Sequence, residues 1–172
     1  MKELPLSGGR AVALVDDEDF DRVNAVGRWQ VHAPYVTSHG VPKAYAQRKV
    51  LDGAGGRRTV RLHRFILDAP AGVDVDHING DGLDNRRCNL RICTRRENIA
   101  NRRKARGTAS RYLGVYWHKG GRKWAAQCGS SHIGMFENEI DAAVAHDRVA
   151  SARYGVFAAL NFPTPILTGS AI

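Results

Sequence analysis

The chain has 172 residues, of which 43% are hydrophobic, and includes 18 glycines and 6 prolines. This composition predicts one ordinary domain or two small ones, with a real core and many turns. No apolar run reaches the roughly 18–20 residues that cross a bilayer, and residues 1–5 lack the apolar stretch of a secretory signal. Three cysteines, Cys88, Cys93 and Cys128, are too few and too irregularly spaced for a disulfide scaffold. We therefore exclude an integral membrane protein, a collagen-like chain and a secreted mini-protein, and expect a cytoplasmic protein with no membrane partner.

The positive charge is concentrated in one stretch. The chain carries 26 Lys and Arg against 17 Asp and Glu, a net charge of +9. Residues 86–106 hold nine basic residues and a single acid, Glu97. Apolar residues such as Leu90 and Ile99 alternate with these charges, which indicates a folded element with a basic face. Net charge alone is equally compatible with a nucleic-acid partner and with a solvated basic surface.

The first 62 residues predict a small antiparallel sheet. Stretches rich in β-branched and aromatic residues, separated by Gly-containing breaks, occur at 11–15, 29–36, 44–50 and 59–62. We expect a short acidic turn or helix at 17–25, and Trp29, Tyr35 and Tyr45 in the core of this β-rich leader.

The middle of the chain predicts a strand–loop–strand–helix unit. After a short helical or extended passage at 63–67, we expect strands at 73–77 and 90–93 around a turn-rich loop at 79–85. Thr94 and Glu97 have the spacing of a capping box, which predicts a helix from there to about Ala105. Residues 107–110 form a plausible hinge.

The C-terminal part predicts three strands and one helix. The strands are expected at 112–118, 123–128 and 132–136, and the helix at about 139–154. Asn138 is the expected N-cap of this helix and Gly155 its stop. Together these segments predict an α+β protein.

Asp76, His77 and Asn98 are the residues best suited to chemistry. A hairpin followed by a capped helix can fold Asn98 back over Asp76, so that a carboxylate and an amide oxygen face one point. Such a pair suits magnesium, which keeps waters and phosphate oxygens as further ligands, better than zinc. His77 lies beside this site and can deprotonate a water near neutral pH.

Other interpretations of these residues are weaker. An isolated Asp-His pair is usually a turn residue beside a surface histidine. Residues 79–82 resemble a calcium loop but lack its alternating oxygen ligands and terminal Glu. Cys88 and Cys93 could join His63 and His77 in a zinc cluster, but their spacing is unusual and core packing is favoured. We expect His63 to pack or to contact a phosphate.

The middle unit resembles the HNH endonucleases of the phage homing type. The resemblance is collinear over about 40 residues: Leu62-His63-Arg64, Val75-Asp76-His77-Ile78-Asn79-Gly80, Leu83-Asp84-Asn85-Arg86, Asn89-Leu90-Arg91 and Thr94-x-x-Glu97-Asn98. It implies a ββα-metal core with one Mg²⁺ or Mn²⁺ bound by Asp76 and Asn98. It also implies that His77 is the general base and that Asn89 braces the loop and orients that base. The expected setting is a bacterial or phage-infected cell.

The C-terminal part resembles the APETALA2-type DNA-binding domain. The matching residues are Tyr112-x-Gly114-Val115, Trp124-Ala125-Ala126, Gly134-x-Phe136, Ala142-Ala143-x-Ala145-His146-Asp147 and Leu160-Asn161-Phe162-Pro163. This family implies a three-stranded sheet on one helix, with the sheet in the DNA major groove. The residues expected to bind DNA are Arg86, Arg91, Arg95, Arg96, Arg102 and Arg103 in the nuclease part, and Tyr116, Trp117, His118, Lys119, Arg122, Lys123 and Gln127 in the C-terminal part.

These resemblances predict a modular, metal-dependent enzyme. The expected organisation is an HNH domain with its leader at 1–106, a linker at 107–110, an APETALA2-type domain at 111–163 and a tail at 164–172. We expect a site-specific homing-type endonuclease that nicks double-stranded DNA as a monomer, without an obligate protein partner. The alternatives are a DNA-binding regulator with a decayed nuclease core and an RNA-binding protein with a basic helix.

Overall fold

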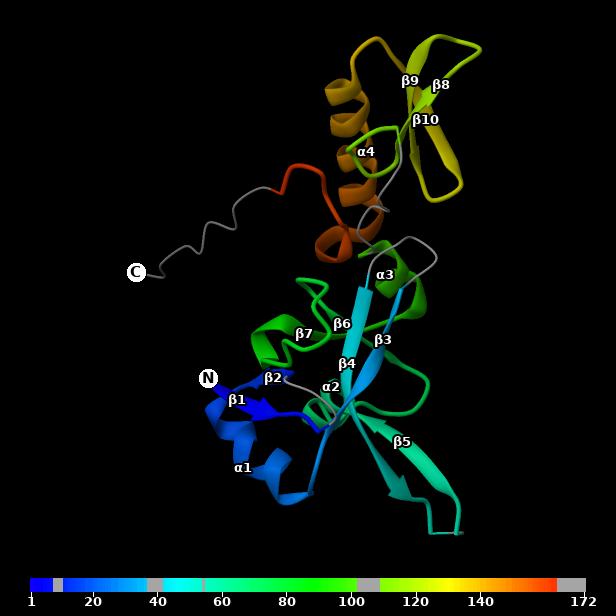
Figure 1. Ribbon diagram of the computed structural model, residues 1–172. Coiled ribbons are helices and arrows are strands. Elements are labelled where there is room, and N and C mark those ends of the chain that lie inside the picture. Colours follow the sequence, from blue (N-terminus) through cyan, green and yellow to red (C-terminus); the bar gives the residue numbers. More distant parts are fainter. Residues whose placement is uncertain (8–10, 37–41, 54, 102–108, 164–172) are drawn as a thin grey trace. The chain divides into compact units, whose positions relative to one another are not determined.

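The computed structural model describes residues 1–7, 11–36, 42–53, 55–101 and 109–163, and the chain divides into two compact units, Met1–Asn101 and Arg102–Ile172 (Figure 1). The predicted linker falls partly outside the described residues, and so does the expected continuation of the basic helix to Ala105. Ser110 is buried and accepts a hydrogen bond of 2.9 Å from the Tyr112 N–H, so it is part of the second unit. No helix in the described ranges is long and apolar enough to cross a bilayer.

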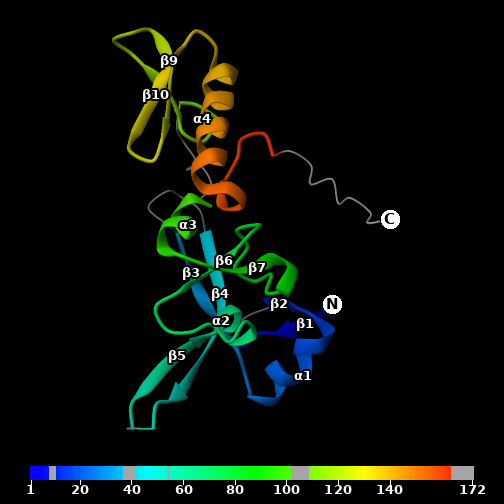
Figure 2. The ribbon, with the colours of Figure 1, turned by 180° about the vertical axis from the view of Figure 1, so that it is seen from behind.

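The first unit contains three small sheets and three short helices. Its elements are β1 (Lys2–Pro5), β2 (Val12–Val15), α1 (Asp17–Ala25), β3 (Gln30–Val36), β4 (Pro42–Leu51), β5 (Arg57–Arg61), α2 (Leu62–Ile66), β6 (Asp74–His77), the 3-10 turn η1 (Arg87–Asn89), β7 (Leu90–Cys93) and α3 (Arg95–Ala100). Antiparallel pairing joins β1 to β2, β3 to β4 to β5, and β6 to β7. Figures 1 and 2 show these strands and helices from opposite sides. The predicted leader strands are confirmed, but they form two sheets instead of one, because β2 pairs with β1 and not with β3–β5. The strand β1 was not predicted, because only Leu4 of its four residues is buried.

The core of the first unit forms around Trp29. Its side chain is 1% exposed, its indole N–H donates to the Val23 carbonyl at 2.9 Å, and its ring packs on Phe65. The prediction that Trp29 belongs to the core is therefore confirmed. Tyr45 is half-buried, and the side chain of Tyr35 lies outside the described residues. This core fastens the leader to α2, the helix that precedes the candidate site.

The leader also holds the loop between β6 and η1. The Leu14 N–H donates to the Leu83 carbonyl at 2.9 Å, and the Asn85 N–H donates to the Leu14 carbonyl at 2.8 Å. Gly82 packs so closely on β4 that a Cβ there would lie 2.2 Å from the Ala44 carbonyl oxygen. Since real Cβ contacts are never this short, the position requires glycine. Two leader strands thus set the path of the chain beyond His77.

A buried carboxylate connects α1 to η1. Asp19 is 3% exposed and accepts hydrogen bonds from Arg87 Nε and Nη2 at 2.7 and 2.8 Å. Arg22, one turn further along α1, lies 3.4 Å from the same carboxylate. The hydrogen bonds from Arg87 and the two positive charges hold the pKa of Asp19 below its usual range. The ionised carboxylate therefore stabilises the folded state.

We expect the substitution Asp19→Asn to make stability less dependent on pH. A depressed carboxyl pKa contributes stability above the unfolded-state pKa, and this is lost as the pH falls through the folded-state pKa. The variant should be less stable by about 1–3 kcal/mol at neutral pH, because the two arginines are partly solvated, and the difference should shrink below about pH 4. Urea unfolding at several pH values measures this. Asp21→Asn, an exposed position on the same helix, is the control, and a pH-independent difference for Asp19→Asn would contradict the linkage.

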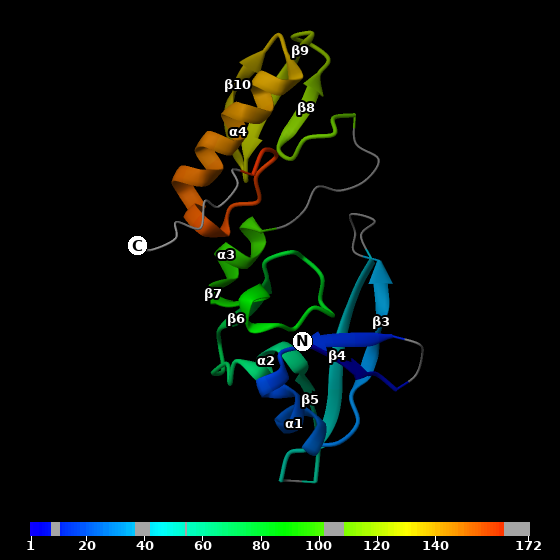
Figure 3. The same cartoon turned by 90° about the vertical axis from the view of Figure 1, so that its left-hand side faces the viewer.

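The second unit is a three-stranded antiparallel sheet packed on one helix. Its elements are β8 (Val115–His118), β9 (Lys123–Cys128), β10 (Ser131–Phe136), α4 (Glu139–Tyr154) and the 3-10 turn η2 (Gly155–Phe157), with strand order β10-β9-β8. Figure 3 shows α4 lying along one face of this sheet. Ala142 and Ala143 are fully buried there, and the Asn138 side chain caps the helix by accepting from the Ile140 N–H at 2.7 Å. The predicted helix, its N-cap, the last two strands and the α+β class are confirmed, whereas the first strand begins at Val115 and not at Tyr112.

His146 and Gly114 close the core of the second unit. Nδ1 of His146 lies 2.7 Å from the Gln127 carbonyl oxygen. Gly114 has φ +72°, and a Cβ there would lie 2.1 Å from the same imidazole nitrogen. A side chain at residue 114 would therefore be excluded by backbone conformation and by space.

Candidate active site

The strands β6 and β7 and the helix α3 form the predicted ββα unit. Asp76 pairs with Arg91 in the β6–β7 register. The capping box at the start of α3 is confirmed: Thr94 Oγ1 accepts from the Glu97 N–H at 3.3 Å, and Glu97 Oε2 accepts from the Thr94 N–H at 2.7 Å. These contacts fix the start of α3 next to the end of β7, which places one helix face over β6.

Asp76 is a buried carboxylate at the centre of this unit. It is 6% exposed, and its Oδ2 accepts from Arg91 Nε and Nη2 at 2.9 and 2.7 Å. The amide of Asn101 donates to Asp76 Oδ2 at 2.9 Å and to Oδ1 at 3.1 Å, and also reaches the His77 carbonyl at 3.1 Å. The immediate helix partner of Asp76 is thus Asn101, a residue that we did not single out from the sequence.

Asn98 lies over a different carboxylate from the one expected. Its Nδ2 donates to Asp74 Oδ2 at 2.8 Å, and this bond, with Arg95 nearby, keeps the pKa of Asp74 below its usual range. Asp74 and Asp76 point to the same face of β6 because side chains alternate along a strand. Asn98 lies in the last turn of α3, and Asn101 is the C-cap residue that follows this helix, three positions further along the chain. The contacts form two acid–amide pairs, Asp74–Asn98 and Asp76–Asn101. We expected Asn98 to contact Asp76, but that position is taken by Asn101, three residues further along the chain.

His77 is enclosed by side chains from both the loop and the leader. It is 5% exposed, and its Nε2 lies 3.5 Å from Asn85 Oδ1. The ring of His63 meets it edge to face, with centroids 4.9 Å apart, and the ring of Tyr45 is 5.8 Å away. The imidazole therefore has a polar neighbour on the loop and aromatic neighbours from α2 and β4.

Asn89 ties the two ends of the loop together. Its Oδ1 accepts from the Asn79 N–H at 2.9 Å, and its Nδ2 donates to the Asp84 carbonyl at 2.8 Å. Its own carbonyl accepts from the Ile78 N–H at 2.9 Å. These bonds hold the residues immediately after His77, which is the geometry that a bracing residue requires.

The arginines of the first unit differ in how available they are. Arg86 binds the buried Asp84 through two hydrogen bonds of 2.8 and 2.7 Å, and Arg91 is only 15% exposed on Asp76. Arg95 is 74% exposed at 3.3 Å from Asp74, and Arg96 is exposed. Arg102 and Arg103 lie outside the described residues. Arg86 and Arg91 thus stabilise the fold, which sequence spacing did not reveal, and DNA contacts by all of these arginines stay predictions.

The candidate DNA-binding residues of the second unit lie on β8, on β9 and in the turn between these two strands. Tyr116 and Trp117 are 39% and 40% exposed, unusually high for large aromatic side chains. Trp117 stands edge to face on Trp124 at 5.2 Å, which holds its ring upright on the sheet. The remaining candidates are His118, Lys119, Arg122 and Gln127, which are exposed, and Lys123, which lies 2.7 Å from Glu137.

Residues 68–100 match the family model of the HNH endonucleases. This segment is an HNH endonuclease domain. No curated protein and no solved structure matches the chain. The HNH domain includes Asp76, His77, Asn89 and Asn98, whereas Asn101, His63 and Tyr45 lie outside the matched residues. The match does not reach the second unit, so its APETALA2-type character stays a prediction.

The oxygen groups around Asp76 fit a hard divalent cation. Magnesium takes one or two carboxylates and fills its other positions with water and phosphate oxygens. Asn98 and Asn101 can each present an amide oxygen to the Asp74–Asp76 face after a half-turn of the amide, since the oxygen and nitrogen are assigned from the bonding pattern. Within the described ranges no three His, Cys, Asp or Glu side chains form a cluster able to hold a metal.

The cysteines do not add a thiolate ligand to this site. Cys93 is 5% exposed, and burial, with Asp76 and Asp74 nearby, raises the pKa of its thiol to about 11. Cys88 is exposed, so the expectation that it packs in the core is wrong. The reason is that η1 turns Cys88 outward while Asn89 faces inward.

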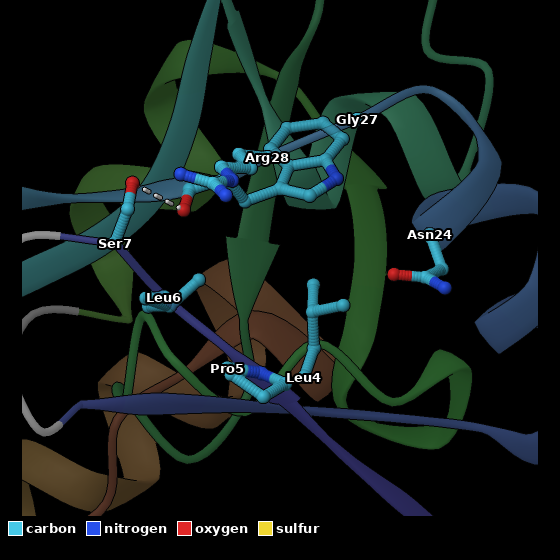
Figure 4. Close-up of a pocket in the computed structure, with 8 residues that line it drawn as sticks. Leu4, Pro5, Leu6, Ser7, Asn24, Gly27 and Arg28 are labelled. Carbon is cyan, nitrogen blue, oxygen red and sulfur yellow. Dashed lines mark hydrogen bonds between the residues drawn. The ribbon is translucent and has the colours of Figure 1, made fainter.

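A hollow elsewhere in the first unit is not a catalytic site. It has a volume of about 400 Å³ and is lined by Leu4, Pro5, Leu6, Ser7, Asn24, Gly27, Arg28 and Trp29. Figure 4 shows the Ser7 hydroxyl bonded to the Trp29 carbonyl, at 3.0 Å, on its wall. None of these eight residues is Asp, Glu, His or Cys, so the hollow has no group for acid–base or metal chemistry at neutral pH.

Proposed function

We propose that this protein is a metal-dependent, site-specific DNA endonuclease of the homing type, which nicks duplex DNA as a monomer. The HNH domain indicates nuclease activity on DNA. The observation that carries the proposal is the arrangement around His77. This residue directly follows Asp76 in the sequence, and it precedes a loop that Asn89 braces. A base, a metal-binding oxygen and a rigid support are the groups that phosphodiester hydrolysis requires.

In the proposed mechanism each residue has a separate task. His77 takes the proton from the attacking water, while Asn89 and Asn85 hold its loop and ring. Asp76 would hold the divalent cation together with one side-chain amide. The HNH resemblance assigns this amide to Asn98, and the hydrogen bond from Asn101 to Asp76 makes Asn101 a second candidate. When bound, Mg²⁺ or Mn²⁺ supplies charge stabilisation to the scissile phosphate and the departing 3′ oxygen. Arg95 and Arg96 are exposed on the same helix, where they can contact the DNA backbone.

We also propose that the second unit recognises DNA through its sheet. The support is the exposure of Tyr116 on β8, together with the exposed basic and amide side chains of the β8–β9 hairpin. Trp117 pairs with Trp124, which packs with α4, so its ring stands on the other face of the sheet. Aromatic rings, cations and amides are the groups that contact bases and phosphates. The other face of the sheet carries Val115 and Ala126 and packs on α4 (Figure 3).

The test is nicking of supercoiled plasmid that carries a preferred site, selected from a random DNA library by binding. Full-length protein should convert it to the open-circular form with Mg²⁺ or Mn²⁺ and stop when a chelator is added. Binding to the selected site without cleavage under any metal condition would favour the DNA-binding regulator. Undiminished cleavage in chelator would contradict the metal mechanism.

We expect Arg96→Gln to weaken binding equally on all DNA sequences. A phosphate contact releases counterions and carries no sequence information, so its loss should lower the salt dependence of binding by about one unit of log Kd per log salt. Fluorescence anisotropy across a salt series measures this. Arg148→Gln, at an exposed position of α4, is the control and should leave the slope unchanged. A loss confined to the preferred site would show that Arg96 contacts bases instead.

A further inference from the structure

The leader places two aromatic residues against the candidate base. His63 from α2 lies with its ring nearly perpendicular to that of His77, at an interplanar angle of 87° and a centroid distance of 4.9 Å. Tyr45 from β4 touches both rings, at 5.6 Å from His63 and 5.8 Å from His77. Each pair has the spacing of a direct ring–ring contact. His77 is thus one of three rings in mutual contact.

His63 cannot move out of this contact without disturbing the core. It is 4% exposed, and its helix neighbours Leu62 and Ile66 are fully buried. Tyr45 is held from the other side, because a Cβ on Gly82 would lie 2.6 Å from its ring, which shows how closely the loop packs on it. The two rings are therefore fixed by the packing of the leader.

His63 takes part in this contact as an uncharged ring. Its Nδ1 is buried without a hydrogen-bond partner among the described residues, and an unpartnered buried polar atom is costly. Burial, with the charge of His77, lowers the pKa of His63 to about 3, so it is a neutral ring at working pH.

We propose that His63 and Tyr45 are positioning residues that hold the imidazole of His77 in its reactive orientation, so that the leader completes the active site of the HNH domain. This inference rests on the proposed function. Both residues lie outside residues 68–100, so the matched segment alone lacks the two aromatic rings that contact His77. On the loop side His77 is supported by Asn85, whose backbone is itself bonded to the leader strand β2.

The test compares His63→Ala, His63→Phe and the control Leu62→Ala in the full-length protein. Leu62 is equally buried next to His63, so Leu62→Ala reports the effect of lost packing on its own. His63→Ala should lower kcat by about 10- to 100-fold with KM nearly unchanged, since a misplaced catalytic group affects the chemical step. His63→Phe should restore most of kcat because it keeps a planar ring. Leu62→Ala should lower Tm without lowering kcat of the folded protein.

A second measurement does not depend on cleavage. The NMR signal of the His77 Cε1–H should shift in His63→Ala and stay near its wild-type position in Leu62→Ala. Wild-type kcat in His63→Ala, or no recovery in His63→Phe, would overturn the positioning role. The proposed function is tested separately, since it fails if the wild-type protein does not cut DNA or if His77→Ala cuts as well as wild type.

Discussion

His77→Ala should lower the rate constant for DNA nicking by about 10²–10⁴-fold, the usual contribution of a general base. The affinity for uncut DNA in the presence of Ca²⁺ should change little, because the base acts only in the chemical step. The His77 ring is buried, but the loop after it is held by Asn89 and by the leader strand β2. Because these bonds do not involve the ring, the variant should keep its fold. Single-turnover cleavage, anisotropy and thermal unfolding measure the three quantities.

Two further variants make this result specific to the imidazole. His77→Gly in the presence of free imidazole should recover part of the lost rate, because a small base can enter the space left by the ring. His132→Ala removes an exposed histidine of β10 and should cut at the wild-type rate. If His77→Ala nicks DNA at the wild-type rate, His77 is not the base.

Asp76→Asn should abolish cleavage with both Mg²⁺ and Mn²⁺, by more than about 10²-fold, because it removes the anionic ligand and keeps the shape of the side chain. The same change should remove metal binding measured by calorimetry. Asp74→Asn is the matched control: it lies on the same face of β6 but bonds to Asn98 and Arg95. It should retain activity within an order of magnitude. A larger loss in Asp74→Asn than in Asp76→Asn would place the metal at the other acid–amide pair.

The roles of the Asn98 and Asn101 amides can be distinguished by the concentration of Mg²⁺ that gives half-maximal cleavage. The residue that binds the cation should raise this concentration when it is replaced by alanine, whereas an amide that only supports Asp76 should lower Tm at every metal concentration. A raised metal requirement in Asn98→Ala agrees with the HNH resemblance. The same change confined to Asn101→Ala would assign the ligand to the residue that contacts Asp76 in the structure.

The leader contacts the HNH domain at several points. The segment that matches the family model begins at residue 68, yet β2, β4 and α2 contact the loop and the base within it. Arg87 of the domain is likewise held by Asp19 of α1. The domain is therefore built into a larger structure, and residues far away in sequence contact its candidate site.

The sequence by itself determined the features that depend on neighbouring residues. The capping box of Thr94 and Glu97, the strand at 90–93, and the helix at 139–154 with its Asn138 cap all follow from local periodicity and turn chemistry. The collinear resemblance that runs from Leu62 to Asn98 was also sufficient to predict an HNH domain. These signals are local because the backbone conformations they specify extend over only a few residues.

Only the tertiary structure decided which of these side chains meet. A helix displaced by one turn moves about 5.4 Å along its axis without any change in local pattern, so spacing could not distinguish Asn98 from Asn101 as the partner of Asp76. The pairing of Arg91 with Asp76 depends on cross-strand register, and the contact of His63 with His77 depends on how the leader packs on the loop. Such contacts join residues distant in sequence, and the free energy that selects them comes from burial of the whole core rather than from any local motif.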